Sequence, residues 1–273
     1  MQKKNTKPQC RATNSAIEFV AFHQTKKIPL ETSLLEQKVL AMQTRRRSPF
    51  AVDSAASSPY QGFNLGLHVG DKPELVNKNR QYLEELLPEH TTIQWLDQVH
   101  SNKVAHIHHV SPRPITADAA ITTNKKVCLA VMTADCLPIL LSAKQGDEIA
   151  AIHGGWKPLA GNIIANTLNK MDTSAVELYA WLGPCIGNTV FEVGEEVRTA
   201  FISQDSSLSQ AFVAKSHGKF LADLSMIAQI QLAHLGVKQI KVQSQCTFLN
   251  SDKYYSYRKK AVTGRMASLI CFR

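Results

Sequence analysis

Two apolar, strand-like runs lie close together near the middle of the chain, and their spacing restricts how the surrounding segment can fold. The runs Leu137–Ser142 and Glu148–His153 flank a short polar turn at Lys144–Asp147, which predicts a β-hairpin. Pairing of these runs makes Cys136 and His153 close cross-strand neighbours at the open end of the hairpin. A thiol beside an imidazole is typical of either a soft metal site or a thiol–imidazole pair, and the hairpin alone leaves both interpretations open.

A third metal ligand is available upstream, in the tripeptide Gln98-Val99-His100. One thiolate and two imidazoles can hold Zn²⁺ with one coordination position open, as catalytic zinc sites require. A single histidine at the end of a strand is more often an exposed polar residue. The metal hypothesis therefore depends on whether His100 meets Cys136 and His153.

Further strand-like and helical runs follow one another along the chain without an internal repeat. The predicted strands are Lys103–His108, Val127–Thr133, Leu137–Ser142, Glu148–His153, Val176–Leu182, Gln239–Gln243 and Ala267–Phe272. The predicted helices are Pro73–Leu87, Leu159–Met171, Gly194–Ile202 and Leu221–Leu235. Strands that occur both in hairpins and between helices indicate mixed sheets with helices outside, so we expect a single α+β domain.

The formal net charge of +9 is concentrated near the N-terminus. Residues 1–47 contain ten basic residues and three acidic ones, whereas the remainder of the chain is nearly neutral. We therefore predict a basic, partly disordered leader at residues 1–40 and a folded domain at residues 41–273. Binding of RNA or another polyanion by this leader, with zinc in a structural role, is a non-enzymatic alternative, but no nucleic-acid-binding motif supports it.

The apolar segments and the cysteines of the sequence indicate the cellular compartment. No apolar run approaches the roughly 18 to 20 residues that span a bilayer, and no apolar signal-peptide segment follows the basic start. The six cysteines contain no CxxC pair, which favours reduced thiols. We expect a cytoplasmic protein without a membrane partner, and the sequence leaves its oligomeric state open.

Several polar residues could bind an anion or move a proton. Arg45, Lys157, Arg258 and Arg265 are candidate anion-binding cations, although each taken alone is more often a surface charge. Asp118 could carry a proton or cap a turn, and sequence spacing does not decide between these roles.

Three neighbouring histidines form a weaker metal-like pattern. His106 and His108 share one face of a predicted strand, whereas His109 points away. A multicopper site needs several such pairs and the chain supplies one. We therefore interpret these histidines as a solvated strand face.

Seven motifs occur in a fixed order along the chain. They begin at Asn64, Gln98, Thr133, His153, Leu182, Phe191 and Ser256 and read NLGLHVGD, QVH, TADC, HGGW, LGPCIG, FEVG and SYR followed by TGRM. In this order they resemble the motifs of the YfiH-like family, which is variously labelled laccase-domain, polyphenol oxidase or purine nucleoside phosphorylase. The resemblance covers about Arg45 to Arg273.

The resemblance implies a layered α/β/β/α sandwich and a zinc ion held by His100, Cys136 and His153, with copper less favoured. It also implies phosphorolysis of the purine nucleosides adenosine, inosine, guanosine and methylthioadenosine, with adenosine deamination as a second activity. The expected partners are therefore a small-molecule nucleoside and phosphate. Some bacterial members are linked instead to the removal of wrongly incorporated peptidoglycan-precursor residues.

On this hypothesis the catalytic residues are Cys136, Asp135 and Asp118, with one of the two carboxylates moving a proton during attack at the purine C6. The substrate-binding residues are Arg45, Asn64, His68, Lys157 and Arg258. Among these, Arg45 and Lys157 would position phosphate against the ribose C1′, and Asn64 and His68 would line the sugar or phosphate pocket.

The chain departs from the family pattern at two positions. The family usually reads HAGWRG, whereas Lys157 stands here in place of the arginine, which weakens the case for bidentate phosphate binding at that position. The usual TRGG motif is replaced by TRRR, which leaves Arg45 as the nearest equivalent arginine. A second hypothesis is a cysteine or zinc hydrolase that edits peptidoglycan precursors, in which Cys136 is the nucleophile and His153 its base.

Overall fold

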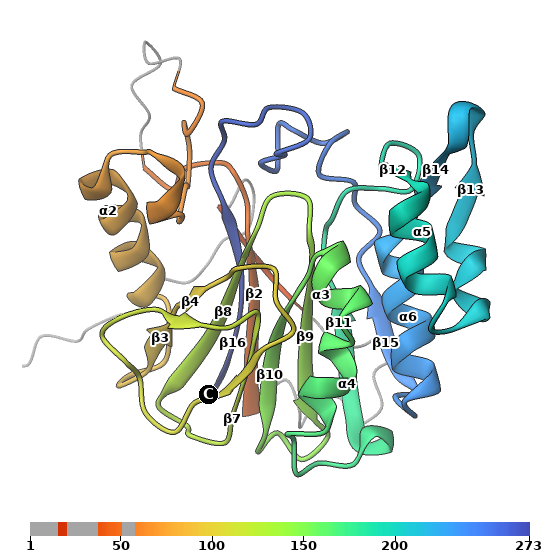
Figure 1. Ribbon diagram of the computed structural model, residues 1–273. Coiled ribbons are helices and arrows are strands. Elements are labelled where there is room, and N and C mark those ends of the chain that lie inside the picture. The colour runs from red at the N-terminus through yellow and green to blue at the C-terminus, as the bar shows by residue number, and fades with distance from the viewer. Residues whose placement is uncertain (1–15, 21–37, 51–57) are drawn as a thin grey trace, which may run out of the picture.

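Two mixed β-sheets form the centre of the protein in the computed structural model, which describes residues 16–20, 38–50 and 58–273 (Figure 1). The first sheet has the strand order β1 (Ile17–Phe19), β2 (Val39–Thr44), β16 (Met266–Phe272), β8 (Val127–Thr133) and β3 (Thr92–Gln94). The second has the order β15 (Gln239–Val242), β11 (Leu178–Leu182), β9 (Leu137–Ala143), β10 (Ile149–Gly154), β7 (Ala119–Thr122) and β5 (Val104–His106).

The alternation of side chains along β8 explains why the two sheets stack. Val127, Leu129 and Val131 point into the core between the sheets, where they meet residues of β9, β10, β11 and β16. Cys128 and Ala130 point to the other side, into a separate core beneath α2 (Pro73–Glu84). Because both faces are buried, strands such as β8 read as continuous apolar runs.

Helices cover the two outer faces of this pair of sheets (Figure 1). The side chain of Leu83 on α2 packs against the first sheet. The second sheet is covered by α3 (Trp156–Ala160), α4 (Ile163–Leu168) and α6 (Leu224–His234), whose apolar side chains share one core with β9 and β10. The predicted α+β fold, with mixed sheets layered α/β/β/α in a single domain, is thus confirmed.

The predicted central hairpin is present. Strands β9 and β10 pair antiparallel, from Ile149 opposite Ser142 to Gly154 opposite Leu137. Cys136 directly precedes β9, and His153 lies opposite Pro138 near the end of β10. The two side chains therefore lie at the same end of the hairpin.

Two predicted helices differ in the structure. The run Leu159–Met171 is not one helix, because Asn162 adopts a left-handed backbone with φ of 62° and separates α3 from α4. The helix predicted from Leu221 begins only at Leu224, where the side chain of Asp223 accepts a hydrogen bond from the Met226 backbone N–H.

A three-stranded sheet, a two-stranded sheet and four short 3₁₀ helices complete the described part of the fold. The small sheet has the order β12 (Glu192–Gly194), β14 (Lys219–Ala222) and β13 (Phe212–Ala214), and it lies beside α5 (Glu195–Ile202). Strands β4 (Leu96–Asp97) and β6 (Ile115–Thr116) form a two-stranded sheet. Short 3₁₀ helices occur at Leu67–Val69, Ala175–Glu177, Ser206–Ala211 and Ser216–Gly218.

Most of the predicted leader at residues 1–40 lies outside the described residues. Within it, β1 pairs antiparallel with β2, and Ile17 is buried against the first sheet. No helix of the described segments combines the length and the apolar character needed to cross a lipid bilayer.

Candidate metal centre and substrate pocket

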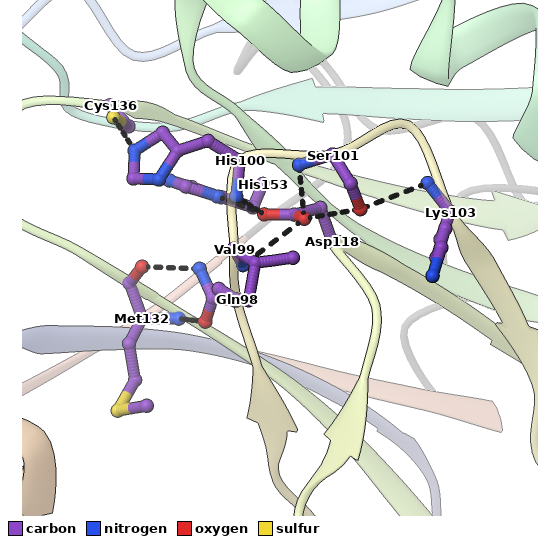
Figure 2. Close-up of polar contacts among 9 residues, drawn as sticks. All are labelled: Gln98, Val99, His100, Ser101, Lys103, Asp118, Met132, Cys136 and His153. Atoms are coloured by element: carbon purple, nitrogen blue, oxygen red, sulfur yellow. Dashed lines mark hydrogen bonds and ion pairs between the residues drawn. The ribbon is translucent and has the colours of Figure 1, made fainter.

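His100, Cys136 and His153 meet at one end of the second sheet. One nitrogen of each imidazole and the sulfur of Cys136 all lie within 4.8 Å of one another. The sulfur is 3.8 Å from Nε2 of His100 (Figure 2). Tetrahedral zinc bonds of about 2.0 to 2.3 Å would place such a pair of ligands about 3.5 Å apart. The three residues are thus positioned to bind a metal ion and leave a fourth coordination position open.

The buried carboxylate of Asp118 holds two of these ligands in place (Figure 2). One oxygen lies 2.8 Å from Nδ1 of His153 and accepts the backbone N–H of His100 at 3.0 Å. The other accepts the backbone N–H of Ser101 at 2.6 Å and its hydroxyl at 2.8 Å, with the Val99 N–H at 3.3 Å. Asp118 therefore leaves Nε2 of His153 free to face a metal, and it fixes the loop in which His100 adopts a φ of 58°.

The side chain of Gln98 joins the His100 loop to the first sheet. The side-chain amide of Gln98 donates to the Met132 carbonyl at 2.8 Å, and its oxygen accepts the Met132 N–H at 2.7 Å. Gln98 of the QVH motif thus anchors the His100 loop to the end of β8.

Gly155 packs directly against the ligands, which gives a test of how tightly the centre is built. An added Cβ at Gly155 would lie 3.1 Å from Cδ2 of His100 and 3.2 Å from the Cys136 sulfur. We expect Gly155→Ala to weaken Zn²⁺ binding by about 10- to 100-fold, because both ligands must move, while the fold is kept. Competition with a chromogenic chelator measures this change.

Gly161→Ala is the matched control. Its added Cβ would meet the Asn102 Cβ and the Lys157 carbonyl at 3.2 Å, equally close but away from the ligands. An equal loss of Zn²⁺ affinity in both variants would show that general crowding around α3, and not contact with the ligands, is responsible.

The Cys136 thiol and the His153 imidazole shift each other's pKa. Burial alone would raise the pKa of the Cys136 thiol, but the neighbouring His153 and His100 imidazoles lower this pKa to about 6. Burial would lower the pKa of His153, but the Cys136 thiolate and the Asp118 carboxylate raise it to about 9. Near neutral pH the metal-free pair is therefore a thiolate beside an imidazolium.

This pairing predicts that Zn²⁺ binding at pH 7.5 releases about one proton per ion. The Cys136 thiol, with a pKa of about 6, has already lost its proton, whereas His153, with a pKa of about 9, must lose one to coordinate the metal. Affinity should therefore rise with pH between these two values. Calorimetry in buffers of different ionisation enthalpy counts the protons, and a count near zero or two would contradict this assignment of charges.

A cavity of about 480 Å³ opens above the ligands. Its polar walls include His68, Gln98, Asp135, Arg258 and Arg265. Its apolar and aromatic walls include Met132, Trp156, Ile186, Phe191, Leu224 and Tyr257. This volume and this mixture of walls are typical of a small-molecule site.

Asp135 lies at the edge of this cavity, but its carboxylate is engaged with the protein. One oxygen accepts the Thr247 hydroxyl at 2.6 Å, and the other accepts the Ser256 hydroxyl at 3.0 Å and the Arg258 backbone N–H at 2.7 Å. These bonds tie the loop that carries Arg258 to the TADC motif. Sequence spacing gave no indication of this contact.

The predicted substrate residues fall into two groups. His68 and Arg258 line the cavity, whereas Arg45, Asn64 and Lys157 are not among its walls. Arg45 forms an ion pair with Glu18 at 2.8 Å. The ammonium of Lys157 lies 5.7 Å from the centre of the Trp156 ring.

Asn64 acts on the cavity indirectly through Arg265. The side-chain oxygen of Asn64 accepts the Arg265 backbone N–H at 2.8 Å. Arg265 lines the cavity, and burial lowers its pKa and the pKa of neighbouring His68. The sequence identified Arg265 only as one of several candidate anion-binding cations, because nothing in the motifs shows that Asn64 reaches across the chain to it.

Comparison with known proteins agrees with this fold and site. The chain belongs to the YfiH-like family, described as multi-copper polyphenol oxidoreductase laccase, whose family model matches residues 44–273. The protein named purine nucleoside phosphorylase YfiH from Escherichia coli is 40% identical over 213 residues, which cover 78% of this chain and 87% of that protein. A protein named purine nucleoside phosphorylase from Haemophilus influenzae is 39% identical over 217 residues, which cover 79% and 88% of the two chains.

A solved structure shares the same fold. Protein NMB0706 of Neisseria meningitidis superposes with a TM-score of 0.83 at 36% sequence identity, over 94% of this chain and 99% of that chain. The family resemblance inferred from the seven motifs is thus confirmed.

Proposed function

We propose that the protein is a zinc-dependent purine nucleoside phosphorylase acting on adenosine, inosine, guanosine and methylthioadenosine. The observation that carries this proposal is a three-ligand centre at the base of a 480 Å³ cavity that also holds two arginines. The names of relatives that are about 40% identical support the same activity.

The apolar walls of the cavity suit a purine base, and its charged walls suit phosphate. Ile186, Leu224 and Tyr257 offer apolar and aromatic surfaces on which a purine ring can stack. Arg265 forms no ion pair with a carboxylate among the described residues. Its Nη1 donates to the Thr263 and Gly264 carbonyls at 3.1 Å, which leaves the other guanidinium nitrogens for phosphate. We therefore assign phosphate to Arg265 and His68, in place of Arg45 and Lys157.

This assignment predicts a specific kinetic defect. Replacement of Arg265 by methionine should raise the KM for phosphate about 10- to 100-fold with a smaller change in kcat, because a charged hydrogen-bond donor to phosphate is lost. Initial rates with inosine at varied phosphate concentrations test this. Lys157→Met is the comparison, and a larger KM effect in that variant would support the original sequence-based assignment instead.

Zn²⁺ suits the donor set of one thiolate and two imidazoles better than a multicopper arrangement does. When bound, it would supply a Lewis acid beside the reacting atoms of the substrate. The side chain of His153 would be held in the correct orientation by Asp118, which makes Asp118 a positioning residue. Asp135 would act similarly by holding the loop of Arg258 against the cavity.

Adenosine deamination is proposed as a second activity of the same pocket. It requires proton transfer near the purine C6, and Asp135 lies in the cavity wall. Asp118 does not line the cavity, and both ring nitrogens of His153 are taken, Nδ1 by Asp118 and Nε2 by the metal, so we assign the proton transfer to Asp135.

A cysteine hydrolase acting on amide or peptidoglycan-precursor bonds is the second candidate. The observation in its favour is the thiolate–imidazolium pair formed by Cys136 and His153, which is the resting state of many cysteine nucleophiles. Alkylation by iodoacetamide distinguishes the two functions. If Cys136 binds zinc, a chelator should accelerate its alkylation, whereas rapid alkylation of the purified protein that a chelator does not change would favour the hydrolase.

The phosphorylase proposal is tested by the products formed from inosine. With phosphate present, the zinc-loaded protein should form hypoxanthine and ribose 1-phosphate, and the rate should saturate with phosphate. Formation of free ribose at a rate independent of phosphate would overturn phosphorolysis in favour of hydrolysis.

A further inference from the structure

A second cavity of about 260 Å³ adjoins the substrate pocket on the side of β12 and α5. The two cavities share three wall residues, namely Trp156, Phe191 and Arg258. The Arg258 guanidinium lies 5.2 Å from the centre of the Phe191 ring and donates to the Glu192 carbonyl at 3.0 Å. The side chain of Arg258 therefore lies along the boundary, and a ligand in the first cavity can extend past it into the second.

The second cavity carries free charges of both signs. Glu196 and Lys219 line it, and neither side chain has an ion pair or hydrogen bond within the described part of the protein. Glu192, which also lines it, has a pKa lowered mainly by Lys215, bound at 2.7 Å, and further by Lys219 and Arg258. The cavity thus presents one carboxylate without a salt bridge, Glu196, and two cations, Lys219 and Arg258, that lie near Glu192 without a salt bridge to it.

The position of the Glu196 carboxylate depends on a glycine. A Cβ added to Gly194 would lie 2.1 Å from one oxygen of Glu196, so the carboxylate lies against the backbone at the start of α5. Val193 and Val197 add apolar surface beside it. The walls therefore combine an anion, cations and an apolar strip within a small volume.

This combination suits a ligand group that carries both an ammonium and a carboxylate on a short apolar arm. A simple anion such as phosphate would be repelled by Glu196, and a simple cation would be repelled by Lys219 and Arg258. The end of an amino acid avoids both repulsions, with its ammonium at Glu196 and its carboxylate at Lys219 and Arg258.

We propose that the protein accepts purine nucleosides whose 5′ carbon carries an arm ending in an amino-acid group, and that the second cavity binds this end. The proposal rests on the proposed phosphorylase function, which places the nucleoside in the first cavity. The 5′ carbon is the suitable attachment point, because phosphorolysis breaks the bond at C1′ and leaves the opposite side of the ribose unchanged.

Two related nucleosides test this inference. S-adenosylhomocysteine and 5′-methylthioadenosine share the adenosine and the 5′ thioether, and only the former has the amino-acid end. Calorimetry with the zinc-loaded full chain should give about tenfold tighter binding of S-adenosylhomocysteine, as expected for two partly exposed charge contacts. Equal binding of the two nucleosides would overturn the proposal. So would equally tight binding of methionine, which carries the arm without the nucleoside.

Three variants test whether the second cavity causes the difference in affinity between the two nucleosides. Glu196→Gln and Lys219→Gln should each remove most of the affinity difference between the two nucleosides. Glu195→Gln is the control, because Glu195 is an exposed carboxylate next to Glu196 on α5 that does not line the cavity, and the difference should persist in it. A difference that survives both Glu196→Gln and Lys219→Gln would overturn the assignment of the cavity.

Failure of this inference and failure of the proposed function give different results. If inosine is phosphorolysed but the two nucleosides bind equally, the phosphorylase stands and the amino-acid subsite falls. If no nucleoside is cleaved but S-adenosylhomocysteine still binds more tightly and the variants remove the difference, the subsite stands as a binding site and the phosphorylase falls.

Discussion

Replacing Cys136 with serine is expected to lower kcat/KM for phosphorolysis of inosine by about a thousandfold and to abolish tight Zn²⁺ binding. The thiolate, already deprotonated near neutral pH because its pKa is about 6, is one of the three groups positioned to bind the metal. A serine hydroxyl is a poor zinc ligand, and loss of the ion removes several kcal/mol of stabilisation of charge in the transition state. Metal content and initial rates of the purified variant measure both effects.

Cys246→Ser is the matched control for this substitution. Cys246 is also a free, partly exposed thiol, but it accepts a hydrogen bond from the Gly187 N–H and does not line the substrate cavity. We expect its metal content and activity to stay near those of the parent protein. A Cys136→Ser variant that keeps both zinc and full activity would exclude Cys136 as a ligand that catalysis needs.

Replacing Asp118 with asparagine is expected to weaken Zn²⁺ binding by about 10- to 100-fold and to lower the free energy of unfolding by about 2 to 4 kcal/mol. The carboxylate accepts hydrogen bonds from three consecutive backbone N–H groups, Val99 to Ser101, and from the His153 imidazole. An asparagine has one acceptor oxygen, so several of these buried donors lose their partner. Chelator competition and urea denaturation measure the two losses.

A positioning role for Asp118 can be tested by adding excess Zn²⁺ to the variant. If Asp118 acts by orienting His153 and the His100 loop, saturating Zn²⁺ should restore part of the lost activity of Asp118→Asn. Asp147→Asn, which changes an exposed carboxylate in the turn between β9 and β10, should alter neither the Zn²⁺ affinity nor the free energy of unfolding. Normal zinc affinity in Asp118→Asn would contradict the role assigned to this carboxylate.

The ligand-bearing hairpin could be predicted from the sequence because its signals are local. The apolar runs of β9 and β10 are long, and a four-residue polar turn joins them, so the pairing that brings Cys136 to His153 follows from spacing alone. The third ligand, His100, is far away in sequence, and the motif resemblance rather than periodicity identified it. The structure adds the reason for its position, which is the set of backbone bonds to Asp118.

Features that depend on contacts between distant loops could not be predicted. Asp118 looked equally suited to a proton carrier and to a turn cap, because its partners lie 17 to 35 residues away in the sequence. Arg265 reaches the cavity because Asn64 holds its backbone, a contact 201 residues apart. The strands β12 to β14 contain only three or four residues each, too few for a clear alternation of apolar and polar side chains.

We propose that His100, Cys136 and His153 hold one zinc ion that nucleoside phosphorolysis requires. The most direct measurement is the zinc content per chain together with the rate of hypoxanthine release from inosine and phosphate, before chelation, after chelation and after zinc is restored. We predict about one zinc ion per chain, loss of the rate when zinc is removed, and recovery of the rate when zinc returns. A zinc-free protein with an undiminished rate, or a zinc-loaded protein that releases no hypoxanthine, would contradict the claim.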